Sequence, residues 1–270
     1  MKRMGWARCA RRMLVALSGL TLVTATVAVA ETPEHAFHDP ASCARPALWV
    51  VNDADTTIFL FGTVHTHDGT TPWFDHAVRR AFDASSTLVL ETLIPAEKPQ
   101  VTVAQGSGLA AARSAVQSAG RAGLSVRFGA DQVLSRAAGA SGKPTIGLES
   151  FAEQLRMYQS LPIPAGPVAA TAAARAPAPD IAPALRNMVD RWSIGDAGPI
   201  EAVVGAVRSQ SPEAYRRLFS DRNEAWAGWI AHRLQQPGTV FVAVGTGHLV
   251  GSDSVQAKLA AHGIKTARIN

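Results

Sequence analysis

Cysteine is scarce in this 270-residue sequence, which contains only Cys9 and Cys43. Cys9 belongs to a leader segment, so Cys43 is left without an intramolecular partner and we expect no disulfide. The sequence also has no G-x-S-x-G elbow, no phosphate-binding P-loop and no G-x-G-x-x-G fingerprint. These absences argue against the common serine hydrolase and nucleotide-binding folds.

The leader is residues 1–30, where basic residues precede an uncharged apolar run from Met13 to Ala30. The run ends in Ala-Val-Ala, an A-x-A cleavage site, so the pattern predicts a secretory signal peptide. An uncleaved N-terminal anchor is the alternative, because the run is nearly long enough to span a bilayer. Arg11-Arg12 leaves a twin-arginine export route open. We therefore expect a periplasmic or secreted protein.

Acidic residues are absent from the leader, which holds five of the 26 basic residues. Residues 31–270 therefore carry 21 basic and 21 acidic side chains. A balanced chain offers no basic surface to nucleic acid or to an anionic membrane, so we expect neither as a partner. The expected partner is a peptide or small-molecule substrate.

Four short apolar runs predict strands that are buried on both faces of a sheet, because they are continuous rather than alternating. They are Thr57–Phe61, Thr87–Leu90, Thr145–Leu148 and Val240–Val244. Leu48–Val51 is expected to pair with the first run as a hairpin, and Thr266–Ile269 to form an edge strand.

Helical periodicity occupies the intervals between these runs. The expected helices cover residues 74–82, 151–160, 185–192, 200–207 and about 212–235. Residues 100–122 show weak periodicity, and the Pro- and Ala-rich residues 162–183 predict a surface loop. Strands that alternate with helices predict one α/β domain over residues 31–270, with a central, mostly parallel sheet covered by helices.

A polar residue follows each of the four predicted buried strands. "FLFGTVH" ends at His65 and "VAVGTGH" at His248, while Glu91 and Glu149 directly follow the other two runs. The carboxyl ends of parallel strands share one edge, where ligand sites form in open α/β sheets. Two imidazoles and two carboxylates suit a divalent metal. Each residue alone has a structural alternative, such as a satisfied core histidine, but their coincidence predicts a shared site.

Arg222 falls on the apolar stripe of the long helix expected at 212–235. An arginine that faces inward needs a carboxylate, a carbonyl or a substrate oxyanion as its partner. The adjacent Asn223 and Glu224 are expected to face outward. His67 forms an H-x-H pair with His65, as in zinc amidohydrolases, but too few strands are predicted for the barrel of those enzymes.

Several segments resemble the TraB/GumN family (TraB/PrgY/GumN), which includes pheromone-shutdown proteins and the Tiki Wnt-inactivating metalloproteases. The matching segments, in family order, are "LWVV", "TIFLFGTVH", "TLVLET", "GKPTIGLESFAEQL", "RWSIGD", "SDRNEAW" and "FVAVGTGHLVG". Two G-x-x-H motifs, an intervening glutamate and an Arg-Asn pair make the resemblance specific. It covers nearly all of the chain after the leader, apart from residues 100–122 and 162–183.

The resemblance implies an exported or membrane-associated α/β protein akin to erythromycin-esterase (EreA) and ChaN-like domains. It also implies divalent-metal-dependent peptidase activity with Mn²⁺ or Co²⁺, and Zn²⁺ as a further candidate. By motif, His65 and His248 match the two G-x-x-H histidines, Glu91 and Glu149 the strand-end glutamates, and Arg222 the helical arginine. The chain departs from the family after each histidine, where the usual proline is missing.

The leading hypothesis is a metal-assisted hydrolase that acts on peptide bonds. His65, His248 and one or both glutamates would hold the ion, and the other glutamate would be the general base. Arg222 would stabilise an oxyanion or orient a glutamate. The sequence does not indicate which of Glu91 and Glu149 is the metal ligand and which is the general base. Two alternatives stay open: a non-catalytic periplasmic peptide- or polysaccharide-binding protein, and an esterase or amidase that acts on small molecules.

Overall fold

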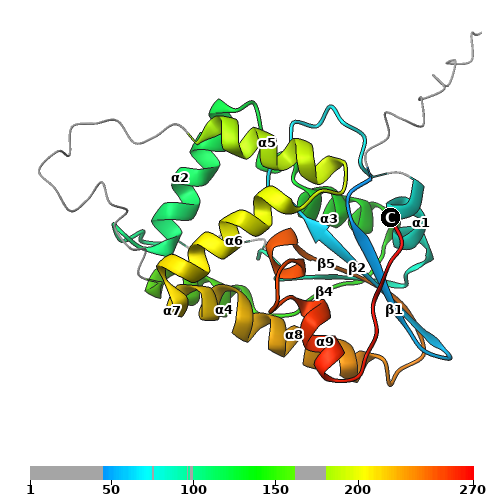
Figure 1. Ribbon diagram of the computed structural model, residues 1–270. Coiled ribbons are helices and arrows are strands. Elements are labelled where there is room, and N and C mark those ends of the chain that lie inside the picture. The colour runs from blue at the N-terminus through cyan, green and yellow to red at the C-terminus, as the bar shows by residue number, and fades with distance from the viewer. Residues whose placement is uncertain (1–44, 75, 96, 98–99, 162–180) are drawn as a thin grey trace, which may run out of the picture. The chain divides into compact units, whose positions relative to one another are not determined.

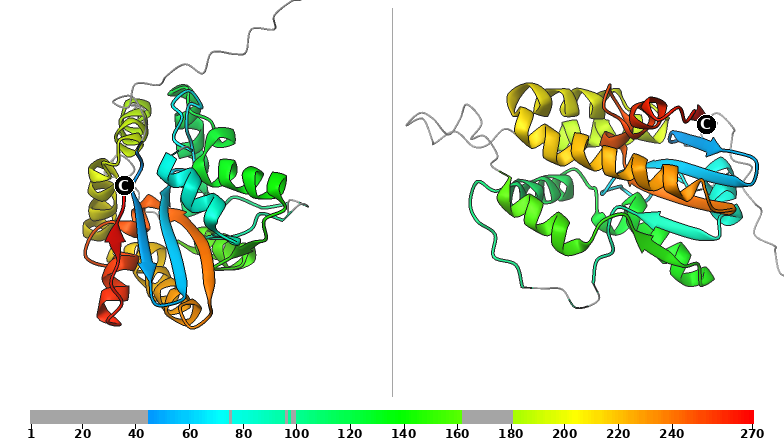
Figure 2. Two further views of the ribbon diagram at one scale, coloured as in Figure 1. Left: turned by 90° about the vertical axis from the view of Figure 1, so that its right-hand side faces the viewer. Right: turned by 90° about the horizontal axis from the view of Figure 1, so that it is seen from below.

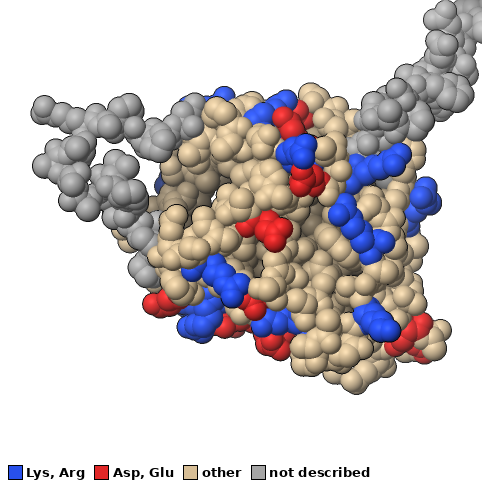
Figure 3. Space-filling model, viewed as in Figure 1, with Lys and Arg blue, Asp and Glu red and all other residues tan. Residues whose placement is uncertain are grey.

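The computed structural model describes residues 45–74, 76–95, 97, 100–161 and 181–270, which belong to one compact unit (Figure 1). The predicted leader, Cys43 and residues 162–180 of the expected loop lie outside the described residues. Within those ranges, no helix is both long and apolar enough to cross a membrane. On the face shown in Figure 3, basic and acidic side chains are scattered among uncharged residues.

The described residues form a six-stranded sheet in the order β4-β3-β5-β2-β1-β6. β2 is parallel to β5, β5 to β3, and β3 to β4, whereas β1 is antiparallel to both β2 and β6. The prediction of a mostly parallel sheet with an N-terminal hairpin is therefore confirmed. The strands are β1 (Leu48–Asn52), β2 (Thr56–Thr63), β3 (Thr87–Leu90), β4 (Thr145–Gly147), β5 (Gly238–Gly245) and β6 (Ala267–Arg268).

Helices cover both faces of the sheet (Figure 2). One face packs against α1 (His76–Ala84) and α3 (Ala130–Ser141), and the other against α8 (Asp221–Arg233) and α9 (Val255–Ala261). The remaining helices are α2 (Gly108–Arg121), α4 (Phe151–Ser160), α5 (Ala182–Ser193), α6 (Gly198–Gln210) and α7 (Pro212–Tyr215). Covered strands of this kind explain the continuous apolar runs of the sequence.

Successive side chains of each strand point to opposite faces of the sheet and so supply both cores. In β2, Phe61 packs with α1 and α3, whereas Ile58 and Leu60 pack with α8 and α9. The same alternation places Phe241 of β5 in the first core and Val242 in the second. All five side chains are fully buried.

Three helices, α2, α3 and α9, were not expected from the sequence. α2 lies in the stretch of weak periodicity, where alanine, glycine and serine leave few large apolar side chains. It begins at Ser107, whose hydroxyl accepts a hydrogen bond from the Ala110 N–H at 3.3 Å. α3 covers a segment for which no element was predicted. α9 is a short helix that buries Val255 and Leu259 against the sheet. Packing against other elements stabilises all three helices.

Three expectations about element type or bounds were wrong. β4 is not buried on both faces, because it is an edge strand and Ile146 is 42% exposed. The expected loop ends earlier than predicted, since α5 begins at Ala182. The long helix at 212–235 is interrupted by a π-helical segment, Arg216–Ser220. Such segments often occur at functional sites, and this one lies just before Arg222.

Trp192 connects α5 to the end of β2. Its indole N–H donates to the Gly62 carbonyl at 2.9 Å, and its ring contacts Phe61 and Trp73 edge-on. The side chain is only 2% exposed. Trp192 therefore fixes the strand end that leads to His65.

Trp192→Phe is expected to lower the free energy of unfolding by about 2–3 kcal/mol, because it leaves the Gly62 carbonyl without its donor and opens a cavity beside Phe61. Urea denaturation followed by circular dichroism measures the loss. Trp49→Phe, at a partly buried ring on β1, is the matched control and should lose less than about 1 kcal/mol. Equal losses in the two variants would contradict the role assigned to Trp192.

Candidate functional site

The carboxyl ends of four adjacent strands carry the predicted residues in one row. In sheet order, Glu149 follows β4, Glu91 follows β3, His248 follows β5 and His65 follows β2. β2 and β5 pair in parallel along their whole lengths, so the two G-x-x-H segments lie side by side. The structure therefore brings the four predicted residues to a single edge of the sheet, where open α/β folds bind ligands.

The two glycine turns, which follow β2 and β5, pack directly against each other. A Cβ at Gly62 would lie 2.8 Å from the Thr246 Oγ1, so no larger residue fits there without a shift. The Thr246 hydroxyl donates to the Thr63 carbonyl at 2.9 Å. The paired motifs thus need glycine and threonine for contact between the two turns as well as for the turns themselves.

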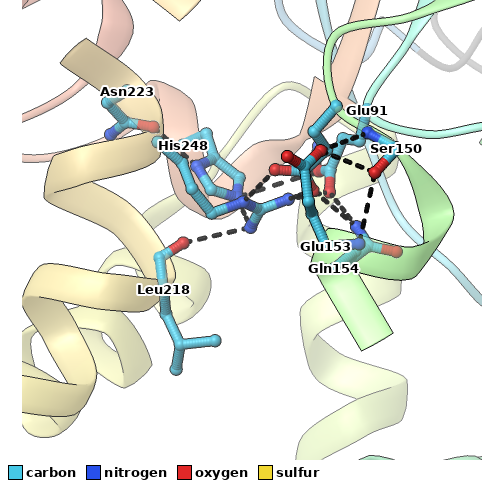
Figure 4. Close-up of polar contacts among 10 residues, drawn as sticks. Glu91, Ser150, Glu153, Gln154, Leu218, Asn223 and His248 are labelled. Atoms are coloured by element: carbon cyan, nitrogen blue, oxygen red, sulfur yellow. Dashed lines mark hydrogen bonds and ion pairs between the residues drawn. The ribbon is translucent and has the colours of Figure 1, made fainter. Parts of the chain in front are cut away.

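Arg222 of α8 lies among these groups, and all five of its N–H donors are used (Figure 4). Nε and Nη2 bind Glu149 Oε2 and Oε1 at 3.0 and 2.6 Å, and Nη2 also binds Glu91 Oε2 at 2.7 Å. Nη1 donates to the Leu218 carbonyl and to His248 Nε2, both at 3.0 Å. Arg222 therefore orients the carboxylates and has no donor free for an oxyanion, which favours the second of its two predicted roles.

The two glutamates are not equivalent. Both oxygens of Glu149 bind Arg222, and Oε1 also accepts from Gln154 Nε2 at 3.0 Å. Glu91 Oε1 instead accepts from the Gly245 N–H at 2.6 Å and lies 3.8 Å from His248 Nε2. Burial alone would raise the pKa of Glu91, but the Arg222 charge and the Gly245 N–H lower it to about 2. Glu91 is thus the carboxylate that faces the histidines.

His248 is held in one neutral tautomer. Arginine only donates, so Nε2 accepts from Arg222, and Nδ1 must carry the proton that it donates to Asn223 Oδ1 at 2.6 Å. Burial lowers the pKa of His248 to about 3, against the attraction of Glu91. Asn223 is 1% exposed and also binds the Asp253 carbonyl. The expectation that Asn223 faces outward was therefore wrong.

His65 differs from His248 in exposure. Its side chain is 65% exposed, and its Nδ1 lies 3.7 Å from Asp131 Oδ1 of α3. The Asp131 carboxylate raises the pKa of His65 toward about 9. Water screens this attraction because the ring is open to solvent, so the increase is smaller than in a buried pair. The Asp131 Oδ1 atom is buried and has no hydrogen-bond partner among the described residues.

Three residues of this row, together with Arg222, form the floor of a cavity of about 450 Å³. His65, Glu91, Arg222 and His248 all line it, whereas Glu149 does not. A Cβ at residue 245 would lie 3.1 Å from Glu91 Oε1, 3.7 Å from His248 Cδ2 and 3.9 Å from His65 Nε2. Glycine at 245 therefore leaves open the space on which the two imidazoles and the Glu91 carboxylate converge.

Four residues near this floor were not predicted: Asn223, Gln154, Tyr158 and Asp131. Gln154 and Tyr158 lie one turn apart on α4, which begins directly after Glu149, and this spacing could have indicated them. Burial and the Glu91 charge raise the pKa of Tyr158, so the phenol that lines the cavity stays protonated. No sequence signal indicated Asp131, because α3 was not expected.

His67 does not lie with His65 in the cavity. It is 1% exposed, its Nδ1 accepts from the Gly69 N–H at 3.0 Å, and its ring packs edge-on against Trp192. Burial lowers the pKa of His67. The H-x-H pair therefore does not present two imidazoles to one site, which agrees with setting the barrel interpretation aside.

A profile of the TraB/PrgY/gumN family matches residues 47–111 and 107–268. The chain belongs to this family. The TraB/PrgY/gumN match includes every strand from β1 to β6 and every residue of the polar row. Comparisons with curated proteins and with solved structures give no match.

Arg222→Met is expected to lower the free energy of unfolding at pH 7 by about 3 kcal/mol, because it leaves two largely buried carboxylates without a cation. The pKa of Glu91 is about 2 in the folded protein, against an ordinary value of 4.5. Its stabilising contribution is therefore complete above pH 4.5 and declines as the pH falls toward 2. Urea denaturation at pH 7 and pH 4, with chelator present, should show a clearly smaller loss at pH 4.

Arg216→Met is the matched control for that variant, since Arg216 lies on the preceding turns and its side chain is 59% exposed. It should change the free energy of unfolding by less than about 0.5 kcal/mol at either pH. The role assigned to Arg222 is wrong if Arg222→Met lowers the free energy of unfolding no more than Arg216→Met does. It is also wrong if the loss caused by Arg222→Met is the same at both pH values.

Proposed function

We propose that this TraB/PrgY/gumN protein is an exported, divalent-metal-dependent hydrolase that cleaves peptide bonds. The observation that carries the proposal is the Glu91 carboxylate, held by the Arg222 guanidinium beside two histidines on the floor of a cavity. Buried charges destabilise a fold unless they are paired, and clusters of them in a cleft are typical of active sites. Export to the periplasm or beyond rests on the apolar leader of residues 1–30 and its A-x-A site.

Three features support a divalent ion at this floor. Two histidines and one carboxylate are a familiar donor set of catalytic metal sites. Each histidine has its Nδ1 beside a side-chain oxygen, Asp131 for His65 and Asn223 for His248, so each turns its Nε2 toward the site. The absent Cβ of Gly245 leaves room between them. His65, Glu91 and His248 are thus the residues that would hold Mn²⁺, Co²⁺ or Zn²⁺.

One contact opposes this assignment. Arg222 Nη1 already donates to the His248 Nε2 lone pair, and no group of three or more His, Cys, Asp or Glu in the described ranges is arranged as a metal site. Nη1 would have to release His248, while the two bonds to Glu149 can keep the guanidinium in place. When bound, the ion would polarise a carbonyl and lower the pKa of a water molecule.

We also assign different roles to the two glutamates. Glu149 and Gln154 position Arg222, and Arg222 orients Glu91. Glu91 is the carboxylate that a substrate in the cavity can contact, so we assign it the direct part in metal binding or proton transfer. Glu149 acts through Arg222 and is a positioning residue.

Metal content tests the proposal. The purified protein, dialysed against Mn²⁺ or Co²⁺, should retain about one ion per chain by elemental analysis, and chelator should abolish hydrolysis of a peptide library. His65→Ala should lower metal affinity by at least about tenfold. His232→Ala, at an exposed histidine of α8, is the control and should leave the affinity unchanged. A protein without stoichiometric metal, whose His65→Ala variant behaves like wild type, would refute the metal mechanism.

Glu91→Gln separates a hydrolase from a binding protein, because it removes a charge and keeps the shape. A hydrolase should lose at least about a hundredfold in kcat/KM while a cleaved peptide still binds. Glu153→Gln, at an exposed glutamate of α4, is the control and should retain activity. If a peptide binds to wild type and is never cleaved under any metal condition, the non-catalytic binding protein becomes the better assignment.

A further inference from the structure

The walls of the cavity differ from its floor. All the charged residues and histidines that line the cavity lie on the floor described above, and the walls above it are apolar. α2 contributes Ala112, Ala115 and Ala119, α5 contributes Met188, and α6 contributes Val203 among others. α2 and α5 are joined in a buried cluster that contains Ala119 of α2 and Val189 of α5. The part of the cavity that these apolar walls enclose, called the chamber below, is therefore formed by packed helices of the fold.

The rim of the chamber is apolar as well. Val116 of α2 is 46% exposed and Val203 of α6 is 49% exposed, although both line the cavity. Large apolar side chains left in contact with water at the mouth of a cavity are typical of binding sites. The volume of about 450 Å³ lies in the usual range of small-ligand pockets, roughly 300–1,000 Å³.

We infer that this chamber is a specificity pocket for a large aliphatic or aromatic side chain of an uncharged peptide segment. The inference deepens the proposed function and rests on it. Such a side chain would gain from leaving water for the apolar walls, whereas an acidic or basic side chain would lose its hydration without finding a partner there. With the side chain in the chamber, the adjacent carbonyl lies toward the polar floor formed by His65, Glu91 and His248.

The small residues of α2 make the room for this side chain. Ala112, Ala115 and Ala119 recur at helical spacing on the face that lines the cavity. Each is the smallest side chain that still favours a helix. A large residue at Ala115 would fill the chamber from the wall and leave the polar floor unchanged.

The direct test is binding of blocked tripeptides, acetyl-Ala-Xaa-Ala-amide, with Xaa as Leu, Phe, Ala, Asp or Lys. Isothermal calorimetry on the full purified protein measures their dissociation constants, and mass spectrometry follows any cleavage separately. The Leu and Phe peptides should bind at least about tenfold more tightly than the Asp and Lys peptides. Equal affinities across the series, or no measurable binding of any peptide, would overturn the inference.

Substitutions test whether the preference for the Leu and Phe peptides depends on the chamber. Ala115→Trp should remove the Leu and Phe preference, whereas Ser114→Trp, at an exposed neighbour that does not line the cavity, should retain it. Should Ala115→Trp fail to fold, Val203→Lys places a charge at the exposed rim and should reduce the preference at least about tenfold, with Ala202→Lys as its control. If the Val203→Lys variant keeps the full preference for the Leu and Phe peptides, the inference is wrong.

The two proposals fail in different ways. Selective binding of Leu and Phe peptides without cleavage under any metal condition supports the chamber and refutes the hydrolase. Cleavage with no preference among the five peptides supports the hydrolase and refutes the chamber.

Discussion

The structure of the site depends on one buried guanidinium. Arg222 joins two carboxylates, a carbonyl and an imidazole with all five of its donors, and its Cζ lies 4.6 Å from the centroid of the Trp226 ring. Removing such charges from water costs several kcal/mol for each ion, and an apolar replacement is often as stable. The network is therefore better explained by the order that it imposes on the strand ends than by a gain in stability.

That order places the two glutamates, and likewise the two histidines, in different surroundings. Glu149 is bound on both oxygens, while Glu91 keeps one oxygen toward the histidines. His248 is buried in a neutral form, and His65 is open to the cavity beside Asp131. Because the charged groups gather on one floor and the helices above present apolar walls, the cavity joins a polar centre to an apolar chamber.

Much of the fold could be predicted because each buried strand corresponds to a short apolar run in the sequence. All six strands and most helices were found in this way, as was the inward position of Arg222. The missed helices share one feature: α2, α3 and α9 are rich in alanine and have few large apolar side chains, and contacts with residues far along the chain stabilise them. The outward direction expected for Asn223 failed because its partner, His248, is distant in sequence and adjacent only after folding.

The sequence alone determined that two histidines and two glutamates would meet at one edge, because each directly follows a parallel strand and such strands end together. Only the tertiary structure decided which oxygen, nitrogen or carbonyl each of them faces. That choice is made where α8 and the turns after β2, β3 and β5 pack against one another, and contacts such as Arg222 with Glu91 and Glu149 join segments far apart in the chain. A local sequence pattern does not predict the direction of a side chain in such a contact, because that direction depends on how several elements pack at once.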